Sequence, residues 1–457
     1  MHSINKALIP LAIAAAGANG AFAAVSAEEA AQLGKTLTPW GAEAAGNADG
    51  SIPAYTGGLT TPPPNFDKGK PTWRPDPFAN EKPLFRIDAK NFQQYKNRLT
   101  PGTIALLEKH PNTFFIDVYK THRSASYPQE WLDNSVKNAT RCNLINDGEG
   151  VDVANGCGGG MVFPIPKSGL EMLWNKEATY RGPAFSTLDL TGRYVKPSGE
   201  VVLTSGPSTK LAAYPLGDPA ATSRDISYAY RIEWRAPTRL NGSASMLIDK
   251  TADLERRAWN YQPSTRRVRL APDYAADTPI SSAGGAIVYD DDVLFTGKRD
   301  RYDWKLVGKK EVYLPYNTYR ISYPEANGGC SDNALLTPNH PKSECVRWEL
   351  HRVWVVEATL KDNKRHVYHK RVLFLDEDIP SNGVADNYDQ AGDLWRVNWN
   401  APIPAYEAKV PGLGEQFSMD LLTGIYFNIT ALKGTRIEPE FDRSVLNSAN
   451  LQSHILR

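Results

Sequence analysis

A run of alternating segments between residues 226 and 320 constrains the fold more than any other feature of the sequence. Residues 226–234 place a large apolar side chain at every second position, which is the period of a β-strand with one apolar and one wet face. These side chains are Tyr228, Tyr230, Ile232 and Trp234. Residues 242–249, 254–261 and 266–270 continue as strands, and a Pro/Ser/Thr turn at 262–265 predicts a hairpin between the last two. The sequence therefore predicts an antiparallel meander.

Further strands extend this sheet on both sides. Residues 302–307 and 311–316 flank Gly308, which predicts another hairpin, and residues 347–360 and 365–375 form the longest one. The remaining strands are predicted at 114–119, 193–195, 200–203, 393–399 and 419–429. We expect six aromatic side chains on the inner face of the sheet: Tyr230, Trp234, Trp259, Tyr261, Trp304 and Trp354. Such a face can line a ligand cavity or fill a core, and the pattern alone leaves both open.

Helices are few in this sequence. Residues 168–175 carry an apolar stripe and begin after Ser168, a suitable N-cap. Residues 88–109 read as helical and are split at Pro101, because proline breaks a helix interior. With 33 prolines and 35 glycines in 457 residues, turns and extended segments should dominate. The expected class is α+β and β-rich.

The first 23 residues have the organisation of a secretory signal peptide. Lys6 precedes an apolar stretch at 7–18, and Ala21-Phe-Ala23 is a small-x-small cleavage site. No cysteine lies near that site, so no bacterial lipid anchor is expected. Residues 25–86 are rich in Gly, Pro, Asn and Thr, which predicts an extended arm laid over the rest of the protein. We expect three regions: the signal peptide at 1–23, an arm and helical segment at 24–160, and a sheet domain at 161–457.

The four cysteines fit an oxidising compartment. Cys142 and Cys157 lie fifteen residues apart, as do Cys330 and Cys345, and each pair sits in a loop rich in glycine and asparagine. Four cysteines allow three pairings, and the two local ones are favoured. Neither loop has the Cys-x2-Cys spacing or the histidines of a metal site, so no metal is expected.

No group of residues in the sequence indicates a catalytic site or a cofactor-binding site. His366 and His369 are three positions apart and should point to opposite faces of a strand, and a Gly-x-Ser-x-Gly elbow is absent. Residues 290–292 are three successive aspartates, for which a solvated turn is a simpler explanation than a cation site. The glycine-rich stretch 156–160 lacks the Lys-Ser/Thr of a phosphate loop.

A basic cluster lies on one predicted hairpin. It consists of Arg256, Arg257, Arg266, Arg267 and Arg269. The simplest explanation is that these arginines lie on solvated faces of the strands. An alternative is a site for an anion, a headgroup or a membrane partner. Nucleic acid is disfavoured because the formal net charge of the chain is only +1 and export is expected.

Several long stretches resemble one bacterial family. They are residues 38–53, 121–128, 234–242, 259–268, 301–317 and 351–360. These resemble a proteobacterial periplasmic family of unknown function related to outer-membrane lipoprotein-sorting proteins, within the lipoprotein carrier superfamily. The resemblance implies a strongly curved antiparallel sheet, a half-open barrel around a hydrophobic cavity, with covering helices. It also implies partners, namely a resistance-nodulation-division type exporter and an outer-membrane protein. The long arm and the two cysteine loops depart from the smaller carriers.

The leading hypothesis from these observations is a soluble periplasmic carrier or adaptor, not an enzyme, for a hydrophobic small molecule or lipid. It would act with an envelope export system and need no cofactor. The alternative is a structural or interaction protein whose aromatic residues form a filled core and whose arm docks an outer-membrane or exporter partner.

Overall fold

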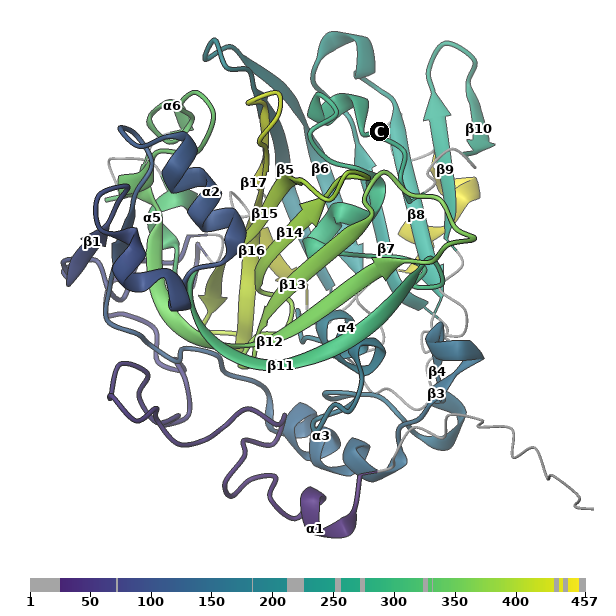
Figure 1. The fold of residues 1–457 in the computed structure, drawn as a ribbon. Helices are drawn as coiled ribbons and strands as arrows, with labels where there is room; N and C mark the ends of the chain where they lie inside the picture. Colours follow the sequence, from purple (N-terminus) through teal and green to yellow (C-terminus); the bar gives the residue numbers. More distant parts are fainter. Residues whose placement is uncertain are drawn as a thin grey trace, which may run out of the picture.

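The computed structural model describes residues 25–70, 73–182, 184–211, 226–250, 256–271, 276–323, 328–330, 332–430, 435–438 and 443–451. The predicted signal peptide lies outside these residues. Within them, 16 strands form one strongly curved sheet that does not close into a barrel (Figure 1). Its order is β1-β2-β12-β13-β14-β15-β16-β17-β5-β6-β7-β8-β9-β10, with β11 paired to β12 and β18 paired to β5. The class is α+β and β-rich, as the sequence predicted.

The strand bounds of this sheet, with the small β3–β4 pair, are as follows: β1 Phe85–Ile87, β2 Ile116–Val118, β3 Leu144–Ile145, β4 Gly150–Val151, β5 Ala184–Val195, β6 Val201–Leu211, β7 Ile226–Glu233, β8 Ala244–Lys250, β9 Arg257–Gln262, β10 Arg267–Leu270, β11 Tyr302–Pro315, β12 Arg347–Leu360, β13 Lys370–Asp376, β14 Gly383–Tyr388, β15 Leu394–Ala405, β16 Val410–Asp420, β17 Tyr426–Thr430 and β18 Thr435–Glu438.

The helical elements are short. The α-helices are α1 Ala27–Ala30, α2 Pro101–Lys109, α3 Gln129–Arg141, α4 Gly169–Glu177, α5 Tyr319–Ser322 and α6 Asp332–Leu335. The 3-10 helices used below are η1 Phe92–Arg98, η6 Thr238–Leu240, η7 Ser281–Ala283, η8 Tyr289–Leu294, η11 Arg443–Leu446 and η12 Ser448–Asn450. No helix among the described residues has the length and apolar character needed to cross a membrane.

The sheet curves around the segment that carries η7 and η8. η7 contacts β5, while η8 contacts β14 and β15, so this one segment touches distant parts of the sheet on a single face, which we call the inner face. α4 covers another part of the inner face through Met172 and Leu173. The outer face is covered by η1 and α2, which bury Phe92 and Leu106 against it. Register shifts in β5, β7, β11 and β15 bend the strands locally, as bulges do.

Two strand predictions need correction. Residues 302–316 are not a hairpin: they form the single strand β11, paired with β12 along its whole length. Val307 is the extra residue of a bulge between the paired residues Leu306 and Gly308, and Gly308 adopts φ 137° beside it instead of forming a turn. Residues 419–429 are not one strand either, since a turn at 421–425 separates β16 from β17.

Long-range contacts hold the N-terminal arm, residues 25–86, against the rest of the described chain. The indole of Trp40 donates to the Glu377 carbonyl (3.2 Å) and packs edge-on against Tyr55. Arg123, which lies beyond the arm, donates to the carbonyl of Glu43 in the arm at 2.7 Å and binds both oxygens of Asp378 at 2.8 Å. β1 and β2, from the same predicted region, join the sheet beside β12.

The predicted local cysteine pairing is confirmed. Cys142 is bonded to Cys157 and Cys330 to Cys345, each across fifteen residues. The first bridge ties the end of α3 to the loop before α4, and the second ties the loop after α5 to the start of β12.

A candidate ligand cavity on the inner face

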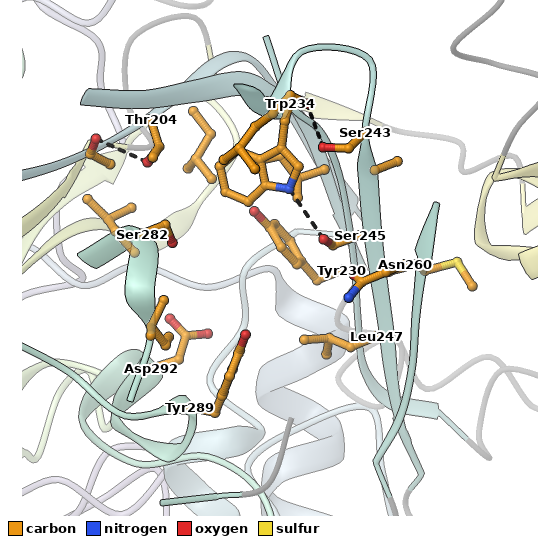
Figure 2. A pocket seen from close by; sticks show the side chains of 18 of the residues that line it. Thr204, Tyr230, Trp234, Ser243, Ser245, Leu247, Asn260, Ser282, Tyr289 and Asp292 are labelled. Atoms are coloured by element: carbon orange, nitrogen blue, oxygen red, sulfur yellow. Dashed lines mark hydrogen bonds between the residues drawn. The ribbon is translucent and has the colours of Figure 1, made fainter. Parts of the chain in front are cut away.

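A cavity of about 270 Å³ lies between the inner face of the sheet and the segment 280–296. β7, β8 and β9 form one wall, η7 and η8 form the opposite wall, and Phe427 and Ile429 of β17 close one end. Figure 2 shows Ser245, Leu247 and Asn260 on the sheet side, facing Ser282, Tyr289 and Asp292 across the space. The apolar lining side chains are Leu190, Tyr228, Tyr230, Ile232, Trp234, Leu240, Leu247, Ile280, Ile287, Phe427 and Ile429.

The alternation of β7 creates this apolar wall. Tyr230 pairs with Leu247 and Ile232 with Ser245, and paired residues of an antiparallel sheet share a face. Trp234 follows β7 at the top of the cavity, where its indole nitrogen donates to the Ser245 hydroxyl at 3.3 Å (Figure 2). The hydrogen bond satisfies the polar edge of the indole and leaves the ring against the apolar space.

The inner end of the cavity is charged. Asp292 of η8 accepts a hydrogen bond from the Tyr228 hydroxyl at 3.5 Å. Burial lowers the pKa of Lys210, an effect that the Asp292 carboxylate opposes. Burial would also lower the pKa of Arg256, but its bidentate pairing with Asp249 (2.8 and 2.9 Å) raises it. A ligand therefore meets charged groups of both signs near Asp292, and a mixture of apolar and uncharged polar side chains along much of the remaining wall.

The six aromatic residues predicted to share one inner face do not all line this cavity. Tyr230 and Trp234 do. Trp259 and Tyr261 pair with Met246 and Ala244 on the opposite face of the sheet. There they pack with Leu446 of η11 and with Leu451, the residue that follows η12. The side chains that β9 directs toward the cavity belong to Asn260 and Gln262. This placement corrects the expectation of a single aromatic face.

Trp304 and Trp354 lie in a packed cluster under α4. Trp304 contacts Phe295 at a ring distance of 4.8 Å, and its indole donates to the Arg299 carbonyl at 2.9 Å. The Lys309 ammonium lies 4.8 Å from the Trp354 ring centre. Neither tryptophan lines the cavity, and contact of any of the six with a ligand stays a prediction.

The three aspartates of η8 were expected in a solvated turn, and this expectation is wrong. Asp290 and Asp291 are buried beside Arg371, which bonds to both carboxylates. His366 Nε2 lies 3.0 Å from Asp290, and the Tyr368 hydroxyl donates to Asp291 at 2.9 Å. Burial alone would raise the pKa of Asp290, but Arg371 and His366 hold it below its usual range. The network fixes η8 to β13 and so places Asp292 in the cavity wall.

A second buried cluster could offer metal ligands. Ligand atoms of His351, Asp376 and Asp378 all lie within 4.8 Å of one another. However, the Arg123 guanidinium occupies both oxygens of Asp378, and His351 Nδ1 lies 3.3 Å from Asp376. Burial raises the pKa of Asp376 to about 7. These contacts make the cluster an internal ion-pair network that joins β12 to the arm.

Sequence reasoning missed most of the polar lining. Lys210, Arg239, Asn260, Tyr289 and Asp292 line the cavity, and none of them was predicted there. For Asn260, the alternation in β9 was a usable signal: a polar residue between Trp259 and Tyr261 must face the other side of the sheet.

Comparisons with known proteins agree on a family. The profile of the family described as "Protein of unknown function (DUF1329)" matches residues 86–457. An uncharacterized protein of Pseudomonas aeruginosa is 39% identical over 416 residues, covering 89% of this chain and 88% of that protein.

Solved structures show more distant likenesses. A DUF1329 family protein from Desulfovibrio piger is 14% identical and has a TM-score of 0.42, covering 62% of this chain and 98% of its own. A putative outer membrane lipoprotein-sorting protein domain from Vibrio parahaemolyticus is 16% identical, also with a TM-score of 0.42, covering 62% of this chain and 97% of its own. A LolA superfamily protein from Nitrosomonas europaea is 10% identical with a TM-score of 0.36, covering 62% of this chain and 98% of its own. On the strength of the profile match and the Pseudomonas relative, the chain belongs to the DUF1329 family of proteins of unknown function.

Proposed function

We propose that this protein is a non-enzymatic carrier that holds a hydrophobic, lipid-like ligand in the inner-face cavity. The single observation that supports this proposal is the cavity itself: about 270 Å³ bounded by aromatic and aliphatic side chains, with polar groups gathered at its ends. Its volume lies just below the range of roughly 300–1,000 Å³ for small-molecule sites. A cavity of this size suits one hydrocarbon chain or a small ring system.

The apolar wall alone gives weak binding. A guest that buries roughly 200 Å² of apolar surface gains about 5 kcal/mol, which corresponds to a Kd of roughly 0.2 mM before the costs of immobilisation. Useful affinity therefore needs polar contacts as well. Asp292, Tyr289 and Asn260 are placed to supply them (Figure 2). A ligand with both an apolar body and a polar group fits this lining best.

The compartment and the partners are part of the proposal. Two disulfides favour an oxidising location, consistent with export to the periplasm. The association with a resistance-nodulation-division type exporter and an outer-membrane protein rests on the family resemblance, and crosslinking in intact cells would test it.

Native mass spectrometry of protein purified from its own periplasm tests carriage. We expect an adduct that solvent extraction identifies as a lipid. Ser282→Trp, whose side chain would enter the cavity from η7 (Figure 2), should lose the adduct. Ser198→Trp in the exposed turn between β5 and β6 makes the same substitution away from the cavity and should keep it.

Protein with intact disulfides and no extractable ligand would contradict carriage. It would favour the alternative of a structural or interaction protein. An adduct that Ser282→Trp retains at full occupancy, with an unchanged melting temperature, would show that the ligand lies elsewhere.

A further inference from the structure

The exposed residues of the cavity lining are Arg239, Gln262 and Ser281, and we call the end where they reach the surface the mouth of the cavity. The chain segments beside this mouth are rich in arginine. The described segments 234–247 and 256–271 contain seven arginines and neither aspartate nor glutamate, although the chain as a whole has 52 basic and 51 acidic residues. The seven are Arg235, Arg239, Arg256, Arg257, Arg266, Arg267 and Arg269. Arg256 is partly buried and forms an ion pair with Asp249, and the other six are exposed.

The strand register places part of this charge on the side of the cavity. Arg267 pairs with Gln262 and Arg269 with Asn260, and both partners line the cavity. Because paired residues share a face, the two arginines continue the cavity wall outward along the edge strand β10. Arg266 stands at the turn before them.

A second element brings another arginine to the same place. Arg239 of η6 lines the cavity directly. Its loop lies against the β9–β10 turn, since a Cβ on Gly242 would lie 3.3 Å from the Pro263 ring. We call Arg239, Arg266, Arg267 and Arg269 the basic rim. Trp234 and Leu240, both part-exposed, border the same opening, so the mouth is cationic and apolar together.

Internal pairing does not account for the basic rim. Within the part of the chain that the structure describes, none of these four guanidinium groups forms a hydrogen bond or an ion pair. Charges on an edge strand also prevent sheet-to-sheet association, but either sign would serve for that. Protection of the sheet edge would not explain Arg239, because this residue lies on the η6 loop and not on the edge strand.

We propose that the basic rim docks this protein on an anionic phospholipid surface, with the mouth of the cavity turned toward the bilayer. The inference deepens the proposed function and rests on it, because docking in this orientation lets a lipid pass between bilayer and cavity. Guanidinium groups form paired hydrogen bonds with phosphate, and tryptophan prefers the headgroup region. Nucleic acid offers phosphates too, but it would leave Trp234 and Leu240 without an apolar partner.

Vesicle co-sedimentation of the full mature chain tests the docking. The probes are pure phosphatidylcholine vesicles and mixed phosphatidylcholine–phosphatidylglycerol vesicles. We expect binding to the mixed vesicles only, weakening as salt is added. R266Q/R267Q/R269Q should lose about fivefold in partitioning per arginine, hence roughly a hundredfold in all. R239Q, on a different element, should lose about fivefold.

Two further variants separate charge from folding. K68Q/K82Q/K90Q removes the same charge from exposed positions remote in sequence and should bind like the parent protein. R266K/R267K/R269K keeps the charge and should retain most of the binding. Equal binding to both vesicle types, or equal loss in the control and rim variants, overturns the proposal. So does tight binding to short DNA duplexes without binding to vesicles.

Cargo measured on the same samples keeps the two proposals distinguishable. If rim variants lose vesicle binding but keep their adduct, the docking surface and the cavity both stand. If the parent protein carries an adduct but ignores anionic vesicles, only the docking proposal fails. If it binds anionic vesicles through the rim without any adduct, carriage fails and docking stands alone.

Discussion

Asp386→Asn should stabilise the protein at neutral and alkaline pH while leaving its stability unchanged in acid. Asp386 of β14 is fully buried, and one of its oxygens accepts a hydrogen bond from the Gly102 amide at 2.9 Å. That amide is one of the unsatisfied donors in the first turn of α2, so the carboxyl caps the helix from the sheet. The other carboxyl oxygen has no partner among the described residues. Burial raises the pKa of Asp386 to about 7 from an ordinary value of 3.8.

The size of the effect follows from these two values. Because the folded state holds this proton more tightly than the unfolded state, the free energy of unfolding falls as pH rises between them. The interval of about three pH units, at 1.36 kcal/mol per unit, gives roughly 4 kcal/mol. This stability is fully present below about pH 4 and is lost by about pH 7. Asparagine presents the same acceptor to Gly102 and does not titrate.

Urea unfolding followed by tryptophan fluorescence, with the disulfides intact, measures this difference across the pH range. The variant and the parent should have nearly equal free energies of unfolding near pH 4, because protonated aspartate and asparagine are both uncharged and both keep a carbonyl oxygen for the Gly102 amide. Their difference should grow to a few kcal/mol above about pH 7. A difference that does not change with pH, or a variant less stable than the parent in alkali, would refute the assignment of a raised pKa to this carboxyl.

Three other outcomes are expected from stability measurements. Replacing Cys330 and Cys345 together by serine should lower the free energy of unfolding by about 3 kcal/mol on the loop-entropy estimate, measured by urea titration. Arg371→Met leaves two buried aspartates of η8 without their cation and should cost roughly 3–5 kcal/mol, with a lower thermal midpoint. Gly308→Ala places a Cβ at φ 137° in the bulge of β11 and should cost about 1–3 kcal/mol; an unchanged midpoint would show that the bulge tolerates a side chain.

Local pattern was sufficient to predict most strands of the sheet. Alternation in residues 226–234 and the long apolar run in 347–360 identified β7 and β12. β12 proved to be buried along both of its faces. Ser168 correctly marked the start of α4, whose first turn it caps by accepting from the Glu171 amide. Proximity along the chain also sufficed for both disulfides. These features depend on neighbours in sequence.

Features that depend on strand register could not be predicted from local sequence patterns. Alternation shows that Trp259 and Tyr261 share a face, but only the pairing with β8 decides that this face is the outer one. Likewise, three consecutive aspartates look like a solvated turn until Arg371, eighty residues later, is placed beneath them. The polar lining of the cavity comes from several strands and two 3-10 helices, so no single stretch of sequence contained the site.

The two walls of the cavity differ in how firmly they are held, and this difference indicates the route of a ligand. The wall made by η8 is tied to β13 through Arg371 and His366, so lifting it would expose buried charges at a cost of several kcal/mol. The opposite wall ends at β10, which pairs with β9 alone among the described strands, and at the η6 loop. Because edge strands separate more readily than buried ion pairs, a ligand should pass at the η6–β10 end. The arginines lie at that end, so passage and docking would share one surface.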